Sequence, residues 1–157
     1  LEVYLCDEGG PKKAFEKAIN NANKVAMSLS DKFCVERHKS QFLELVKNKI
    51  DITFANEEEI KSLIDANNFN EIIDFANEIK KILVITMGDK GAISIVNGKL
   101  TKVDIKKNLN IVDLTGAGDL FASGYLHGFL NNFSQKECLE KGTEMSSKVI
   151  QLFGARL

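Results

Sequence analysis

Residues that mark special classes of protein are scarce in this sequence. Its 157 residues include one proline, no tryptophan and three cysteines, and its formal net charge is −1. Widely spaced cysteines without a Cys-x-x-Cys pair argue against a disulfide framework and favour a reducing, cytoplasmic location. A charge so close to zero, with both signs interspersed, argues against nucleic acid or an anionic membrane surface as a partner. No apolar run is long enough to cross a bilayer.

What the sequence does contain is typical of a globular domain with a core of its own. Hydrophobic residues make up 44% of the chain and charged residues 27%, and 157 residues suffice for one domain. Residue 1 is Leu rather than Met, and residues 1–5 have the pattern of a strand with no signal peptide before them. We therefore expect the chain to begin within a longer protein.

Helical and strand patterns alternate along the chain. The predicted helices cover residues 11–18, 36–47, 60–64, 72–79, 118–130 and a segment from Ser134, and the predicted strands cover 1–5, 24–29, 51–55, 82–86 and 110–112. Asn97-Gly98 lies between two alternating runs, 91–96 and 99–103, and predicts a β-hairpin. This order favours an α/β fold, with a mostly parallel sheet, helices on both faces and an antiparallel hairpin at the edge.

A glycine-rich turn, Asp113-Leu114-Thr115-Gly116-Ala117-Gly118-Asp119, is the most informative segment. It precedes a predicted helix, whose first N–H groups lack backbone partners and can hold a phosphate or a developing oxyanion. A carboxylate at Asp119 would repel a bound phosphate, so its presence favours a base beside a reacting phosphoryl group. The structural alternative is a tight turn in which Asp119 only stabilises the helix dipole. The turn by itself leaves both interpretations open.

Two further polar segments follow predicted strands. Asn56-Glu57-Glu58-Glu59 has the spacing of a helix cap, and a compatible alternative is that Asn56 and Glu59 organise hydrated Mg²⁺ and phosphate oxygens. The second segment is Thr86-Met87-Gly88-Asp89-Lys90-Gly91. It is either a loop that leads into the hairpin, or a nucleotide site in which the Thr hydroxyl and the backbone of the glycines contact phosphate groups. Ligands of open sheets bind at the carboxyl ends of strands, so we expect Asn56, Thr86 and Asp113 to converge on one ligand.

Together these segments resemble the motifs of the ribokinase (PfkB) family of sugar and nucleoside kinases. The turn 113–119 resembles the family's C-terminal signature, 56–59 its Asn-x-x-Glu motif, and 86–91 its Thr-x-Gly-x-x-Gly nucleotide segment. The segment Phe153-Gly154-Ala155-Arg156 is similar to the family's closing segment, and the motifs occur in the family's order. The resemblance implies a three-layer α/β/α ribokinase-like fold. Leu114 departs from the pattern, because it replaces a more usual Thr.

The resemblance also implies transfer of the γ-phosphoryl group of ATP to an alcohol group. Asp119 would be the base that takes the proton of the acceptor hydroxyl. The N–H groups of Gly116, Ala117 and Gly118 would form the anion hole for the transferred phosphoryl group. These roles match the needs of phosphoryl transfer, which depends on positioning and charge stabilisation.

The cofactors implied by the resemblance are ATP and Mg²⁺, with K⁺ in some family members. Asn56 and Glu59 would tune Mg²⁺ and phosphate, with Glu59 acting through water. The ATP site would be lined by Thr86, Gly88 and Gly91. The positions that hold a monovalent cation in some members are matched by Asp113 and Thr115.

The acceptor implied by the resemblance is a hydroxymethyl group of a small carbohydrate, with a nucleoside as the alternative. A regulatory homologue that binds nucleotide without turnover is disfavoured by the intact Asp119. A dinucleotide-dependent oxidoreductase is disfavoured because the glycine-rich turn comes late and lacks Gly-x-Gly-x-x-Gly spacing. Family members are roughly twice as long, so residues 1–157 would form the C-terminal, ATP-binding and catalytic part, without the N-terminal substrate and lid part. A homodimer is compatible with this assignment.

Overall fold

The structure is a computed structural model that describes residues 1, 6 and 9–157. Its strands are β1 (Ala26–Ser28), β2 (Ile52–Asn56), β3 (Ile82–Thr86), β4 (Ala92–Val96) and β5 (Lys99–Val103). Its helices are α1 (Gly10–Asn21), α2 (Lys32–Arg37), α3 (Lys39–Asn48), α4 (Glu57–Ile64), α5 (Phe69–Ile79), α6 (Ala117–Leu130) and α7 (Gln135–Val149), with a 3-10 turn, η2, at Gly88–Lys90. Within the described part of the chain, no helix combines the length and the apolarity that a bilayer crossing needs.

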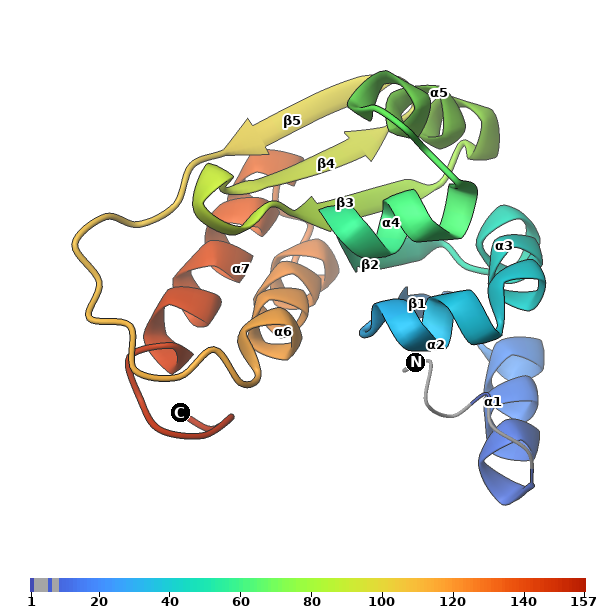
Figure 1. The fold of residues 1–157 in the computed structure, drawn as a ribbon, viewed down its shortest axis with the longest axis horizontal. Helices are drawn as coiled ribbons and strands as arrows, with labels where there is room; N and C mark the ends of the chain where they lie inside the picture. The colour runs from blue at the N-terminus through green and yellow to red at the C-terminus, as the bar shows by residue number, and fades with distance from the viewer. Residues whose placement is uncertain (2–5, 7–8) are drawn as a thin grey trace. The chain divides into compact units, whose positions relative to one another are not determined.

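One five-stranded mixed sheet connects these elements in the order β1-β2-β3-β4-β5 (Figure 1). β1 and β2 run parallel, with Met27 opposite Thr53, and β4 and β5 form an antiparallel hairpin at the edge. The predicted α/β class, mostly parallel with an edge hairpin, is therefore confirmed. The chain divides into two compact units, Leu1–Ile85 with Ile95–Lys99 and Thr86–Ser94 with Leu100–Leu157.

Polar side chains set where helices of the first unit begin. Asp31 caps α2, Asn56 caps α4 and Asn68 caps α5, each by accepting N–H groups that a helix start leaves open. α4 ends at Asp65, whose φ of 54° is left-handed. Because Asn56 is both the last residue of β2 and the cap of α4, no loop separates this strand from its helix.

The core of the first unit centres on β3. Leu83, Val84 and Ile85 are each 0% exposed, as expected for a strand that is covered on both faces. Around it, α2, α3, α4 and α5 pack on one another, and α4 also packs on β2. Each buried aliphatic side chain of this kind contributes about 1.5–3 kcal/mol relative to the exposed state, so apolar burial is the main force that holds the unit together.

The edge hairpin has the turn that its sequence predicts. Asn97 has φ 49° and Gly98 has φ 79°, the two left-handed residues of a type I′ turn. Gly91, at the other end of β4, has φ 89°, and a Cβ added there would lie 2.0 Å from the carbonyl oxygen of Val103. Only glycine fits at this approach between the two chain segments.

In the second unit, α6 and α7 lie side by side (Figure 1). A Cβ added at Gly124 would lie 2.5 Å from the carbonyl oxygen of Lys141, and one added at Gly142 would lie 2.8 Å from the carbonyl oxygen of Phe121. These distances are shorter than van der Waals contact, so the two backbones approach this closely only because both residues are glycine.

All three cysteines are buried and none forms a disulfide. Cys6 and Cys34 belong to the first unit, and Cys138 belongs to the second. Burial raises the pKa of the Cys138 thiol and keeps it in the protonated, less reactive form.

Some predicted elements differ from the structure. The helix predicted at 36–47 is two helices, because His38 leaves the helical region with φ −115° and ψ 23°, and the Asp31 cap starts α2 ahead of the predicted position. The strand predicted at 110–112 is wrong: the segment is an exposed loop, in which Val112 donates its N–H to the carbonyl of Ile150. β1 covers only residues 26–28 of the predicted 24–29. Residues 2–5 of the strand predicted at 1–5 lie outside the described residues.

We expect Gly124→Ala to destabilise the full-length protein by about 1–3 kcal/mol, because the new methyl group would collide with the Lys141 carbonyl. The gain in helix propensity, up to about 1 kcal/mol, is smaller. Gly118→Ala is the control in the same helix, since no atom lies within 4 Å of its new Cβ, and it should not lower the melting temperature. Thermal melts followed by circular dichroism compare the variants. A wild-type melting temperature for Gly124→Ala would contradict the close backbone approach.

Candidate functional site

The turn from Asp113 to Asp119 leads into α6 and belongs to the second unit. Gly116 is the N-cap of α6 and has φ 78°, which glycine adopts without strain. A Cβ at Gly116 would lie 2.7 Å from the Cβ of Ala155. The turn therefore needs glycine at this position both for its conformation and for its contact with the closing segment.

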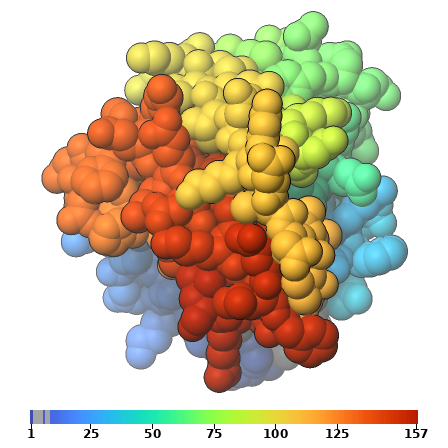
Figure 2. All heavy atoms as spheres, turned by 90° about the vertical axis from the view of Figure 1, so that its left-hand side faces the viewer, coloured from blue at the N-terminus to red at the C-terminus, as the bar shows by residue number. Residues whose placement is uncertain are grey.

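The carboxylate of Asp113 holds the turn and the closing segment together. Its Oδ1 accepts the N–H of Thr115 at 2.9 Å and the hydroxyl of Thr115 at 2.7 Å. Its Oδ2 accepts the N–H of Gly154 at 2.9 Å. The bonds from Thr115, and then the bond from Gly154, lower the pKa of Asp113 because they favour its charged form. The two segments lie side by side in Figure 2, in orange and red.

The N–H groups at the start of α6 differ in what they already bind. Leu120 donates its N–H to the carbonyl of Gly116 at 2.9 Å and closes the first helical turn. Ala117 donates its N–H to the carbonyl of Leu114 at 3.1 Å, so this amide is used within the turn. Gly116 and Gly118 lie at the helix start, where N–H groups lack intrahelical partners and the helix dipole favours an anion. The arrangement suits a phosphate oxygen or a developing negative charge.

Asp119 is an exposed residue in the first turn of α6. The helix dipole stabilises its negative charge at this position, and its exposure lets the carboxylate reach a molecule that comes to the helix start. The structure thus places an exposed carboxylate beside the N–H groups of a helix start. This is the juxtaposition that the sequence of the turn suggests.

The segment Thr86–Gly91 leaves β3 and enters β4 through a tight loop. Gly88 begins η2 with φ 59°, and Met87 donates its N–H to the carbonyl of Gly91 at 2.8 Å. A Cβ added at Gly88 would meet no atom within 4 Å. At Gly88 the loop therefore exposes backbone without a covering side chain, which allows close approach by a ligand such as a phosphate group, whereas Gly91 is buried.

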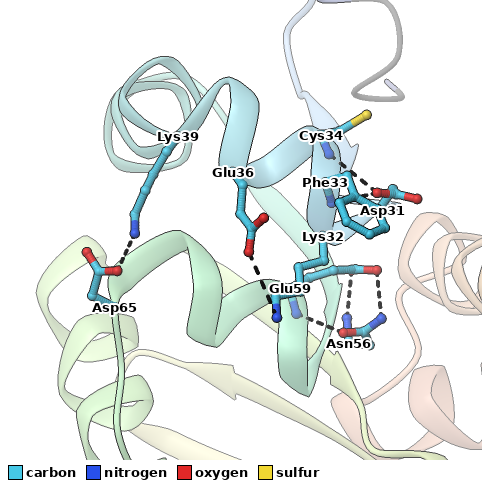
Figure 3. Close-up of polar contacts among 9 residues, drawn as sticks. All are labelled: Asp31, Lys32, Phe33, Cys34, Glu36, Lys39, Asn56, Glu59 and Asp65. Carbon is cyan, nitrogen blue, oxygen red and sulfur yellow. Dashed lines mark hydrogen bonds and ion pairs between the residues drawn. The ribbon is translucent and has the colours of Figure 1, made fainter.

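In the first unit, Asn56 and Glu59 form a complete capping box (Figure 3). The Glu59 carboxylate accepts the backbone N–H of Asn56 at 2.9 Å and its side-chain N–H at 2.7 Å. In return, Asn56 Oδ1 accepts the N–H of Glu59 at 2.8 Å. The predicted cap is confirmed, and it leaves Asn56 exposed and Glu59 only 6% exposed.

Burial raises the pKa of Glu59, the N–H of Asn56 opposes this shift, and the negative charge of Asp31 adds to it. A cation beside Glu59 would relieve this cost, because an opposite charge favours the ionised form. Among residues 9–157 and the two described before them, no three His, Cys, Asp or Glu side chains gather as a metal site. A metal ion at Glu59 would therefore take most of its ligands from water or phosphate, as Mg²⁺ does.

Some of the predicted site residues lie within the second unit, and the others belong to the first unit. The turn 113–119 contacts the closing segment, and the loop 86–91 belongs to the same unit, whereas Asn56 and Glu59 belong to the first unit. The bond between Asp113 and Gly154 has no local sequence signal, because 41 residues separate the two partners. The motif 56–59 does not predict the charge of Asp31 near Glu59, although an Asp before an apolar helical pattern is a known cap signal.

The mixed sheet with its edge hairpin and the glycine-rich start of α6 define a class, the ribokinase-like α/β proteins. The model of the pfkB family carbohydrate kinases matches residues 5–157. The chain belongs to this family, and the predicted membership is confirmed.

Similar proteins include both nucleoside and sugar kinases. An adenosine kinase from Sinorhizobium meliloti has a TM-score of 0.94 and 34% identity, over 99% of this chain and 49% of that one. A probable sugar kinase from Rhizobium etli CFN 42 has a TM-score of 0.93 and 35% identity, over 99% and 48%. A cytidine kinase from Thermococcus kodakarensis is 29% identical over 74% of this chain and 42% of its own length. The chain thus spans less than half the length of each of these proteins.

We expect Asp113→Asn to release the closing segment, because an asparagine has one acceptor oxygen and cannot hold Thr115 and Gly154 together. Hydrogen exchange of the peptide that contains Gly154, measured by mass spectrometry on the full-length protein, should become roughly tenfold faster. Thr115→Val is the control, since it removes only the hydroxyl bond and should leave Gly154 protected. Because the folded pKa of Asp113 is lowered, wild-type protection should persist at mild acidity and disappear as pH falls through that lowered value. Unchanged exchange in Asp113→Asn would refute the role of this carboxylate.

A second prediction concerns the pH dependence of stability at Glu59. Its folded pKa is raised above 4.5, so the folded protein binds this proton more tightly than the unfolded chain. Its contribution to the unfolding free energy therefore declines as pH rises from the usual glutamate value through the raised one. Glu59→Gln removes this decline, so the unfolding free energy of the variant should rise relative to that of wild type as pH increases from the usual glutamate value.

Urea titrations at several pH values, without nucleotide or metal, measure this difference in the full-length protein. Glu58→Gln is the matched control, because it removes an exposed carboxylate from the same helical turn. The shift should be specific to Glu59→Gln. A constant difference across the pH range would show that burial of this carboxylate does not affect stability as we infer.

Proposed function

We propose that the full-length protein transfers the γ-phosphoryl group of ATP to a hydroxymethyl group of a small carbohydrate. The observation that carries this proposal is the exposed carboxylate of Asp119 beside the N–H groups that open α6. An anion site alone would suit many ligands, but a base next to it suits a reaction in which a hydroxyl attacks a phosphoryl group. Membership of the pfkB family supports the same reaction type.

In this reaction Asp119 takes the proton of the acceptor hydroxyl, and the oxygen of that hydroxyl forms a bond to the γ-phosphorus. The bond from that phosphorus to the bridging oxygen breaks, and ADP leaves with the electron pair. Gly116 and Gly118 donate their N–H groups to the transferred phosphoryl oxygens and stabilise their charge. Ala117, whose N–H already binds the carbonyl of Leu114, shapes the turn and makes no such contact in our proposal.

The residues that would hold the nucleotide and its ions have chemistry that suits these groups. Thr86, Gly88 and Gly91 would line the nucleotide site. Open backbone at Gly88 permits close approach of a phosphate, whereas Gly91, which is buried against Val103, would shape the loop. Glu59 would hold hydrated Mg²⁺, an ion that neutralises phosphate charge when it is bound. At Asp113 and Thr115, a K⁺ ion would use lone pairs that remain after Asp113 has accepted its hydrogen bonds.

A nucleoside acceptor is the second candidate, and the similarity to an adenosine kinase supports it as directly as the similarity to a probable sugar kinase supports a carbohydrate. Incubating the full-length protein with ATP, Mg²⁺ and a panel of sugars and nucleosides separates the two. Consumption of ATP with none of these acceptors, despite measurable ATP binding, would favour a regulatory, non-catalytic role.

We expect Asp119→Asn to lower kcat on the accepted substrate by about 10²–10⁴-fold, because the amide cannot take up the hydroxyl proton. Glu140→Gln on the exposed face of α7 makes the same change in charge and is the control. Coupled assays of ADP release at saturating ATP compare both with wild type. Turnover of Asp119→Asn within a few-fold of wild type would rule out Asp119 as the base.

A further inference from the structure

We propose that a polar cluster of the buried Ser94 and Tyr125 with the half-buried Gln135 positions α6, and with it Asp119, relative to the strand that follows the loop 86–91. The three residues come from β4, α6 and α7, all within the second unit. The inference rests on the proposed function, because its consequence is the alignment of the base in phosphoryl transfer. The three members act as positioning residues.

The cluster is built around one amide oxygen. Gln135 Oε1 accepts the hydroxyl of Ser94 at 2.8 Å and also accepts the hydroxyl of Tyr125. The two hydroxyl oxygens of Ser94 and Tyr125 lie 3.4 Å apart. Ser94 and Tyr125 are each 0% exposed, so water does not offer either hydroxyl an alternative partner.

Buried hydrogen bonds of this kind select one arrangement of the elements that carry them. Apolar contacts tolerate small sliding movements, whereas hydrogen bonds weaken steeply with angle and distance. A hydroxyl that loses its buried partner costs about 1–3 kcal/mol in desolvation. A shift of α6 and α7 along β4 would separate Ser94 from its partners Gln135 and Tyr125. A shift of α6 along α7 would separate Tyr125 from Gln135, so either movement leaves such a group unpaired. The cluster therefore fixes the axial position of α6 more sharply than apolar packing would.

The cluster lies about equally far along the chain from both parts of the proposed site. Tyr125 follows Asp119 by six residues of the same helix, or about 9 Å along its axis. Ser94 follows Gly91 by three residues of extended chain, or about 10 Å. Both paths run through regular secondary structure, so a displacement of α6 relative to β4 at the cluster becomes a displacement of Asp119 relative to the loop 86–91, which stays with β4.

The protonation of Tyr125 keeps this arrangement constant. Burial raises the pKa of Tyr125 to about 12, although its bonds to Ser94 and Gln135 act in the opposite direction. The phenol therefore stays a neutral donor at neutral pH, with Gln135 Oε1 as its acceptor. Because the Tyr125 hydroxyl remains a donor, its hydrogen bond between α6 and α7 is maintained.

Tyr125→Phe tests the proposal, because it keeps the ring and removes only the hydroxyl. In the full-length protein we expect kcat to fall by about tenfold, while KM for ATP stays within about twofold. Gln135→Ala should behave alike, and Gln135→Glu, which restores an acceptor oxygen, should recover most of the turnover. Ile93→Val is the matched control, since Ile93 is a buried residue of the same strand, 2% exposed, with its side chain on the opposite face.

A second measurement does not need activity. Hydrogen exchange of the peptide covering residues 117–120 should be faster in Tyr125→Phe than in wild type and unchanged in Ile93→Val. If Tyr125→Phe lowers only the melting temperature, with kcat and this exchange at wild-type values, the cluster is merely structural and the proposal is overturned. If the wild type phosphorylates nothing, the proposed function fails, and the exchange result alone decides whether the cluster positions α6.

Discussion

The second unit depends on the contact between the backbones of α6 and α7 at Gly124 and Gly142. No side chain separates the helices there, so the axis of α6 is fixed by main-chain atoms that cannot change rotamer. Asp119 and the N–H groups before it sit at the end of the same helix. The direction of this end is therefore decided more than one helical turn away, and the polar cluster around Gln135 adds control over its axial position.

The acidic side chains of the two units are tuned in opposite directions by the same kind of local structure. Asp113 accepts three hydrogen bonds near the surface and is stabilised as an anion. Glu59 accepts two from Asn56, but burial outweighs them and disfavours its charge. The hydrogen bonds to Asp113 thus favour its charged form, whereas those to Glu59 do not offset the cost of burying its charge.

Much of the fold could be predicted from local patterns, because those patterns are enforced by local physics. The caps at Asn56 and Ser134, the left-handed pair Asn97-Gly98 and the buried run of β3 need only neighbouring residues to form. The break at His38 and the loop at 110–112 could not be predicted, since an apolar pattern does not show where tertiary contacts end an element. The candidate site was found from motifs, but the bonds that support it, such as that between Asp113 and Gly154, join residues distant in the sequence.

The buried cysteines allow local opening to be measured separately in each of the two units. Cys34 lies in the core of the first unit and Cys138 lies between the helices of the second, and neither is in a disulfide. A thiol reagent reaches each only when the structure around it opens, so the labelling rate at each thiol reports the local opening free energy there. The labelling rates of Cys34 and Cys138 thus report separately on the opening of the first and the second unit. A ligand that closes only one unit would slow labelling in that unit and leave the other rate unchanged.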